Sequence, residues 1–310
     1  MAEDESPKKE APEETPAEEA PAPKTRRARR AAPKAEKAKA AAPAEKGPAL
    51  RPGQVRVYSM EGEPVKTIDL PAVFRSEVRQ DLIRRAVTAF QANRRQPYGP
   101  NSRSGMKHSV RWSGKGHGVS RVPRLRGGMT GAQAPGTVGG RRAHPPRPDT
   151  IWEKKMNSHE RGLARNAALA ALRDPAIVSA RGHRFDVRLS LPVVLEDAIE
   201  SFEPEEGATR EGLAILERLG LQDDVVRAKD GRHVRAGRGK LRGRRLRQPR
   251  SLLVVVKEPA KVRRLFGNLP GVEVTSPAGL NAEILAPGGD PGRLALFSEG
   301  AIELIRSWQP

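Results

Sequence analysis

The sequence predicts an α/β protein built on an open, mostly parallel, three-layer sheet, with a long extended basic loop inserted into it. Short apolar segments alternate with segments of helical periodicity between residues 55 and 307, which is the pattern of strands joined by helices. Residues 94–148 interrupt this alternation, with 12 Lys or Arg residues, no Asp or Glu, 11 glycines and 7 prolines. We therefore expect one folded domain over residues 51–310, from which residues 95–150 extend as a loop.

The first expected elements are a hairpin and a helix. Residues 55–58 and 65–68 alternate apolar and polar side chains on either side of a turn, which predicts two paired strands. Ser76 then precedes apolar residues at helical spacing, so a helix is expected over residues 76–93. The apolar face of this helix consists of Val78, Leu82, Ile83, Ala86, Val87 and Phe90.

After the loop, helices and strands alternate again. The sequence from Asn157 to Glu160 matches a capping box, at the start of a helix that ends near Asp174 and Pro175. Strands are expected at residues 192–195, 251–256, 272–274 and 294–297, and helices at residues 209–219, 261–266 and 299–307. The almost continuous apolar run 251–256 is typical of a central parallel strand that is covered on both faces.

The net charge of +20 is concentrated in two segments. Residues 94–148 carry 12 basic residues and no acidic ones, and residues 227–250 carry 11 against the single Asp230. Blocks of like charge repel one another and need a polyanion as partner. Nucleic acid is the expected polyanion. An acidic membrane surface is the alternative, and it is disfavoured because neither segment has an amphipathic helical pattern.

Residues 1–50 have a low-complexity sequence of Ala, Pro, Glu and Lys, which we expect to be disordered. The basic half of this extension, residues 24–46, either touches RNA or only keeps the chain soluble. The chain contains no cysteine, which excludes disulfides and thiolate metal sites. No apolar run approaches the ~20 residues that a membrane-spanning helix needs.

The segment Ser113–Gly118 has the composition of a nucleotide-binding loop but not its spacing. A phosphate-cradling loop needs Gly-x-x-x-x-Gly-Lys-Ser/Thr, and here Ser109 stands where the first Gly belongs. The glycines would instead let the backbone approach RNA phosphates closely. The cations that would neutralise these phosphates are Arg111, Lys115, Arg121, Arg124 and Arg126. The alternative is a flexible, solvated loop.

No set of side chains in the sequence predicts catalysis. The histidines lack the paired spacing of metal ligands, and we expect His117 and His144 to hydrogen-bond RNA or backbone. Glu196, Asp197 and Glu200 are interpreted as the solvated start of a helix rather than as a catalytic pair. We therefore expect no enzymatic activity, no cofactor and no metal.

Residues 227–250 are the second candidate RNA-binding loop, and a mobile basic loop is the alternative. The candidate residues are Arg235, Arg238, Lys240, Arg242, Arg244, Arg245 and Arg247. They follow the helix that Gly220 ends and precede the strand at residue 251. We expect this connection at one edge of the sheet, facing an RNA groove.

Four stretches of this sequence occur together and in order. Residues 94–99 read RRQPYG, residues 112–124 read WSGKGHGVSRVPR, residues 138–146 read VGGRRAHPP and residues 238–246 read RGKLRGRRL. They resemble the universal large-subunit ribosomal protein four, in its archaeal and eukaryotic branch. The resemblance covers about residues 52–308. It leaves residues 1–50 without a counterpart, and His117 stands where many relatives carry Arg.

The resemblance implies a Rossmann-like domain without nucleotide, which binds large-subunit ribosomal RNA, supports assembly and sends its loop toward the nascent-peptide exit tunnel. It also implies cytoplasmic ribosomes as the location, and neighbouring ribosomal proteins as partners, among them the other protein of the tunnel constriction. Neither a membrane nor a homo-oligomer is implied. The candidate tunnel-lining residues are Arg121, Arg124, Arg126 and Met129. The candidate RNA-binding residues of the loop are Arg94, Arg95, Tyr98, Arg103, Lys107, His108, Arg111, Trp112, Lys115, His117, Arg121, Arg124, Arg126, Arg141, Arg142, His144 and Arg147.

Two other classes of protein remain as alternatives. An RNA-modifying enzyme with a Rossmann-like domain and a basic arm needs a Gly-rich loop directly after a strand and an acidic ligand for the ribose, and the sequence offers neither. A nucleoid-type DNA-binding protein would show equal affinity for duplex DNA and structured RNA.

Overall fold

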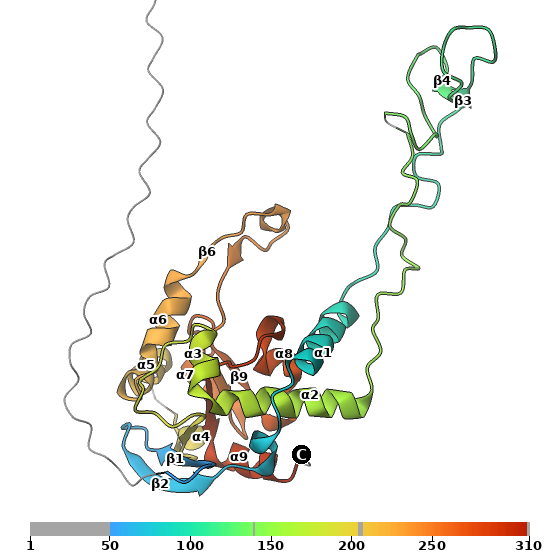
Figure 1. Ribbon diagram of the computed structural model, residues 1–310. Coiled ribbons are helices and arrows are strands. Elements are labelled where there is room, and N and C mark those ends of the chain that lie inside the picture. Colours follow the sequence, from blue (N-terminus) through green and yellow to red (C-terminus); the bar gives the residue numbers. More distant parts are fainter. Residues whose placement is uncertain (1–49, 139, 204–206, 309–310) are drawn as a thin grey trace, which may run out of the picture. The chain divides into compact units, whose positions relative to one another are not determined.

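The main sheet of the computed structural model has six strands in the order β2-β1-β5-β10-β8-β9 (Figure 1). The structure describes residues 50–138, 140–203 and 207–308, so the predicted disordered extension lies, except for Leu50, outside the described residues. The strands are β1 (Gln54–Tyr58), β2 (Pro64–Asp69), β5 (Val193–Leu195), β8 (Leu253–Val255), β9 (Glu273–Thr275) and β10 (Ala295–Ser298). Strand β2 pairs antiparallel with β1, and the other pairs are parallel. The prediction of a mostly parallel α/β sheet is confirmed.

Alternate side chains of the central strands belong to two different hydrophobic cores. In β8, Leu253 and Val255 lie in one core and Val254 in the other. In β10, Phe297 lies in the first core and Leu296 in the second. Because successive side chains of a strand point to opposite faces, both faces of the sheet are buried under helices. This accounts for the almost unbroken apolar sequence of these strands.

Helices cover the sheet on both faces. The first core contains residues of η1 (Ala72–Arg75), α1 (Gln80–Asn93), α2 (Ser158–Ala170), α8 (Ala282–Leu285) and α9 (Glu299–Arg306). The second core contains residues of α3 (Pro175–Ala180), α4 (Ala198–Ser201), α5 (Ala208–Arg218), α6 (Gln222–Asp230) and α7 (Pro259–Phe266). Short 3₁₀ turns are η2 (Ala171–Arg173), η3 (Arg238–Leu241), η4 (Pro277–Gly279) and η5 (Pro287–Gly289). Two ribbons, β3 (Val110–Arg111) with β4 (Arg124–Leu125) and β6 (His233–Val234) with β7 (Leu246–Arg247), lie outside the main sheet.

One predicted helix start and one predicted helix cap differ from the structure. The helix expected from residue 76 begins at Gln80, because Ser76 closes the preceding 3₁₀ turn by donating its backbone N–H to the Val73 carbonyl. The predicted capping box at residues 157–160 is wrong. No side-chain capping bond forms at Asn157, and the Glu160 carboxylate lies 3.2 Å from the guanidinium of Arg85 on α1. Glu160 therefore ties two helices together instead of capping one.

Helix α6 is absent from the sequence prediction. Gly220 has a φ of +68° and turns the chain after α5, so a second short helix begins two residues later. Residues 227–230, which were expected to begin the second basic loop, form the last turn of α6. The predicted loop over residues 227–250 is correspondingly shorter, and only residues 231–250 lie between the helix and the strand region.

The buried carboxylate of Asp224 fastens α6 to the body. It accepts hydrogen bonds from the ring of His183 at 3.1 Å, from Nε of Arg227 at 2.8 Å and from the hydroxyl of Ser251 at 2.9 Å. Burial alone opposes the charged form, but the hydrogen bonds from His183 and Arg227 outweigh it and hold the pKa of Asp224 well below its usual range. Arg227 is thus part of the fold, although it lies in a strongly basic stretch.

Candidate RNA-binding arms

Residues 95–150, the long arm, leave the body after α1 and return to α2 as two chains that run side by side (Figure 1). At the base, the Lys154 backbone N–H donates to Oδ1 of Asn93 at 2.8 Å. One step further, Cζ of Arg95 lies 3.6 Å from the centroid of the Trp152 ring, a cation–π contact. Beyond that, a Cβ on Gly99 would come within 2.7 Å of the Pro146 carbonyl oxygen. Close approach of the two chains therefore requires glycine at this position.

The far end of the long arm contains two turns. Strands β3 and β4 pair Val110 with Leu125, which encloses the turn 112–123. The backbone N–H of Leu125 also donates to the Thr130 carbonyl at 3.0 Å, which closes the turn 125–130. Nearer the body, the side-chain amide of Gln133 donates to the His108 carbonyl at 2.6 Å and joins the outgoing and returning chains. The distal part of the long arm is thus a folded-back ribbon with local hydrogen bonds.

The long arm has almost no hydrophobic core. Among its described residues only Ala132 is buried. Large apolar side chains are exposed instead: Tyr98 is 59% exposed, Trp112 54% and Met129 66%. Exposed aromatic rings between cations can stack on unpaired bases. The composition and burial of this segment fit a binding surface and not a packed element.

Most predicted RNA-binding cations of the long arm form no ion pair with the residues that the structure describes. Arg94 is an exception, since it pairs with Glu283 at 2.5 Å, and Arg95 stacks on Trp152. The cations that form no ion pair with any described residue are Arg103, Lys107, Arg111, Lys115, Arg121, Arg126, Arg141, Arg142 and Arg147. The side chains of His108, His117 and His144 are exposed on the same segment. This excess of uncompensated charge can be neutralised only by an anionic partner.

Arg124 differs from its neighbours because its guanidinium is used inside the arm. It donates to the Met129 carbonyl across the turn 125–130, and to the hydroxyl of Ser120 at 3.1 Å. The sequence placed Arg124 among the residues that face RNA and line the tunnel. In the structure, the hydrogen bonds of Arg124 also link the two distal turns of the arm.

Residues 231–250, the short arm, form the second basic ribbon. Strands β6 and β7 pair His233 with Arg247, and the backbone N–H of Arg235 donates to the Arg245 carbonyl at 2.8 Å. Leu241 lies in the turn between the strands and is 81% exposed. Among the predicted residues here, Arg235 and Lys240 donate to the carbonyls of Arg244 and Ala236. Arg238, Arg242, Arg244, Arg245 and Arg247 form no ion pair with described residues.

The carboxyl edge of the parallel strands, where open α/β sheets usually bind ligands, is occupied by an acidic side chain of the protein itself. The carboxylate of Glu200 accepts hydrogen bonds from the backbone N–H of Lys257 at 2.7 Å, from that of Glu258 at 3.3 Å and from the hydroxyl of Ser298 at 2.6 Å. Asp197 accepts from the backbone N–H of Gly300 at 2.7 Å. These donors begin α7 and α9, and such N–H groups hold phosphates in nucleotide-binding domains. Glu196, Asp197 and Glu200 were expected to be a solvated helix start. Asp197 is exposed and directly precedes α4, as expected, whereas Glu200 lies within α4 and its carboxylate is bonded by residues at the starts of α7 and α9.

One cluster of side chains could not be predicted from the sequence, because the fold brings its residues together from distant positions in the chain. Arg181 at the end of α3, Arg227 on α6 and Arg250 at the end of the short arm line one pocket together with the predicted Arg247. These residues come from separate elements, so no local sequence motif predicts the cluster.

None of the helices in the described part of the chain is both long and apolar enough to cross a membrane.

Comparisons with known proteins agree with the geometry of a body that carries basic arms. The family model described as "Ribosomal protein L4/L1 family" matches residues 68–308. A protein of Methanothrix thermoacetophila named "Large ribosomal subunit protein uL4" is 48% identical over 250 residues, which are 81% of this chain and 97% of the relative. Proteins of the same name from Thermoplasma acidophilum and Methanocaldococcus jannaschii are 43% and 44% identical, over 82% and 81% of this chain and 97% of each relative.

These matches include both arms and nearly the whole length of each relative. The alternative of an RNA-modifying enzyme receives no support from these matches. A nucleotide site at the carboxyl edge of the sheet is also unsupported, because Glu200 occupies that edge. The three relatives named here are archaeal proteins. The chain belongs to the ribosomal protein L4/L1 family, as one of its archaeal-type members.

Proposed function

We propose that this chain is a structural, non-enzymatic constituent of the large subunit of cytoplasmic ribosomes, where it binds large-subunit ribosomal RNA and supports assembly. The observation that carries the proposal is the long arm, which has nine cations without an ion pair and a single buried residue among those described. Ribosomal RNA provides the phosphates that such an arm needs. The printed name of the archaeal relatives, "Large ribosomal subunit protein uL4", supports the same assignment.

In this proposal the two arms bind RNA, and the body positions the arms. The body, residues 51–310 without the arms, is a Rossmann-like scaffold that holds no nucleotide, and residues 1–50 are an extension outside it. Unpaired cations of both arms contact phosphates, while Tyr98 and Trp112 contact bases. Binding orders the long arm, and phosphate contacts offset the conformational entropy that is lost.

The two distal turns of the long arm are proposed to reach the nascent-peptide tunnel. Arg121, Arg126 and Met129 are the candidates for lining it, and Arg124 supports them by bridging the two turns. Neighbouring ribosomal proteins, among them the other protein of the tunnel constriction, would be the protein partners. The chain acts as a single copy in each subunit and not as a homo-oligomer.

Sedimentation of a cell extract tests the proposal. The chain is expected to sediment with large subunits and to stay bound through a wash at moderate salt. Recovery of the chain only at the top of the gradient would contradict the proposal. An equal affinity of the purified protein for duplex DNA and for structured RNA would favour a nucleoid-type DNA-binding protein instead.

A further inference from the structure

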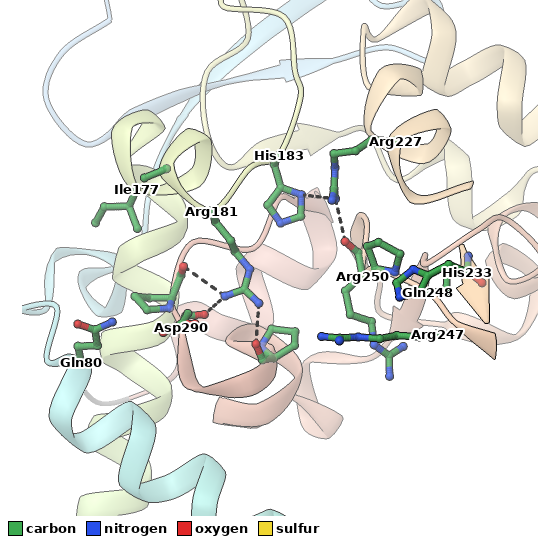
Figure 2. A pocket seen from close by; sticks show the side chains of 14 residues that line it. Gln80, Ile177, Arg181, His183, Arg227, His233, Arg247, Gln248, Arg250 and Asp290 are labelled. Carbon is green, nitrogen blue, oxygen red and sulfur yellow. Dashed lines mark hydrogen bonds between the residues drawn. The ribbon is translucent and has the colours of Figure 1, made fainter. Parts of the chain in front are cut away.

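A basic pocket of about 910 Å³ lies in the body at the foot of the short arm (Figure 2). Its lining comes from α1, α3, α6, the end of the short arm and the segment after η5. The charged and polar side chains in it are Gln80, Arg181, His183, Arg227, His233, Arg247, Gln248, Arg250 and Asp290. Four of these are arginines and one is a carboxylate, so the pocket is strongly cationic.

Arg181 is the central cation of the pocket and is held in place by backbone carbonyls. Its Nη2 donates to the Pro287 carbonyl at 2.6 Å, and its Nη1 donates to the carbonyls of Asp290 and Pro291 (Figure 2). Burial lowers the pKa of Arg181, and the charge of Asp290 opposes this effect. Three of the five N–H groups are used in this way, so Nε–H and one Nη2–H are left for a ligand.

The remaining charges of the pocket do not neutralise Arg181 and Arg247. Arg227 is paired with Asp224 at 2.8 Å, and Arg250 with Glu273 at 2.6 Å. The Asp290 carboxylate is bonded to Arg84 at 3.2 Å, on the outer side of α1. Arg181 and Arg247 therefore present two positive charges that no carboxylate of the described residues contacts directly. Arg181 is partly buried without a paired carboxylate and Arg247 is exposed beside it in the same pocket, so an anionic ligand would stabilise this arrangement.

The size and walls of the pocket favour a nucleotide over an isolated anion. Its volume is at the upper end of the range of roughly 300–1,000 Å³ that is typical of ligand sites. Ile177, Pro249, Pro287 and Pro291 provide apolar wall between the cations. The amide groups of Gln80 and Gln248 can both donate and accept hydrogen bonds, as the edge of a base requires.

We infer that this pocket holds an unpaired nucleotide of the ribosomal RNA together with its flanking phosphates. Arg181 and Arg247 bind the phosphates, and the apolar wall and the glutamines receive the base. Proteins read RNA sequence mainly at such splayed, unpaired nucleotides. The pocket thus adds an RNA contact at the place where the short arm meets the body. This inference rests on the proposed function, because RNA is its ligand.

Two variants separate the pocket from general charge effects. Arg247→Gln removes a phosphate contact, and Ala180→Trp fills the pocket from the exposed end of α3 without changing its charge. Arg264→Gln is the matched control, an exposed arginine of α7 that lines none of the cavities described. Binding of the full-length chain to a large-subunit ribosomal RNA transcript is measured at fixed salt. We expect affinity to fall by about tenfold for each pocket variant, and to stay within about twofold for the control.

A site-directed probe identifies the nucleotide. The chain has no cysteine, so Ala180→Cys creates a single attachment point for a photo-crosslinker. With the labelled protein bound to the transcript, crosslinks should map to one unpaired position of the RNA. Ser307→Cys, at the end of α9 and outside the lining of this pocket, serves as the comparison and should give a different pattern or none.

The outcomes distinguish this inference from the proposed function. If the wild-type chain binds the transcript, and both pocket variants bind as tightly as it does, the pocket inference is wrong and the proposed function stands. Failure of the wild-type chain to bind the transcript at all would overturn both. Saturable binding of free UMP or AMP that Ala180→Trp abolishes, with RNA affinity unchanged, would assign the pocket to a free nucleotide and also overturn the inference. Unchanged melting temperatures of the variants confirm that folding is not the cause.

Discussion

Cζ of Arg95 lies over the ring of Trp152, 3.6 Å from its centroid, at the point where the two chains of the long arm meet the body. Nε1 of Trp152 is buried without a hydrogen-bond partner among the described residues. The pair joins residues 57 positions apart and keeps the outgoing and returning chains together at the base. Arg95, predicted as an RNA contact, therefore also has a partner within the protein.

Replacing Trp152 by Ala should loosen the base of the arm without unfolding the body. The cation–π contact contributes about 0.5–1 kcal/mol at such a site. We expect faster amide hydrogen exchange at residues 94–97 and 150–154, and a melting temperature within about 2 °C of wild type. Trp152→Phe, which keeps a ring for Arg95, should fall between the two. A large drop in melting temperature for Trp152→Ala would show that the pair belongs to the core instead.

Replacing Asp224 by Asn should destabilise the body strongly. The change leaves Arg227 and His183 without their buried anion, which costs about 3–5 kcal/mol. Urea unfolding at pH 7 measures the loss. Asp223→Asn, at the adjacent residue in the first turn of the same helix, is the control and should change stability by less than about 1 kcal/mol.

The same carboxylate predicts a pH dependence. The pKa of Asp224 is lower in the folded than in the unfolded chain, so below about pH 4 the unfolded state binds the extra proton. The stabilisation is therefore complete above the unfolded pKa and is lost as the pH falls toward the folded one. Wild type should lose more stability between pH 5 and pH 2.5 than Asp224→Asn does, and parallel curves for the two proteins would contradict the assignment.

Arg124 and Arg121 should respond differently to substitution by lysine. Arg124 bridges two turns with several donors, which an ammonium group cannot replace, whereas a phosphate contact at Arg121 needs mainly charge. We expect Arg121→Lys to bind the RNA transcript within about threefold of wild type, and Arg124→Lys to bind about tenfold more weakly. Equal effects of the two substitutions would remove the structural role of Arg124.

The affinity of the chain for RNA should fall steeply with salt. If about six arm cations meet phosphates, the logarithm of the affinity should fall against the logarithm of salt concentration with a slope near −5. Arg111→Gln should reduce that slope by about one unit, since it removes one phosphate contact. A slope near zero would show that phosphate contacts do not drive binding.

Much of the fold followed from local patterns. Unbroken apolar runs such as 253–255 predicted the central strands, because a strand covered on both faces has no polar side. Helix α6 was missed because it has only nine residues and its last four were assigned to the basic loop that follows. The capping box at Asn157 was predicted wrongly because the local pattern cannot show that Glu160 pairs with Arg85, which lies 75 residues away in the sequence.

The two basic arms of the candidate site could be predicted from the sequence, because charge alone defines them. Both basic arms stand out as segments without carboxylates, and no long-range information is needed to see them. The role of Glu200 at the carboxyl edge could not be predicted, since its three donors come from residues 257, 258 and 298. The basic pocket likewise depends on bringing Arg181 and Arg247 together from different elements.

The most direct test of the account is deletion of residues 100–145 in the cell. The close approach of Gly99 to Pro146 means that a linker of two glycines can join the ends without disturbing the body. Sedimentation of extracts that contain the tagged deletion protein and the tagged wild type then compares their entry into large subunits. We predict a folded, soluble deletion protein that is missing from mature subunits. Its presence there at the wild-type level would contradict the claim that the long arm is what binds this protein to ribosomal RNA.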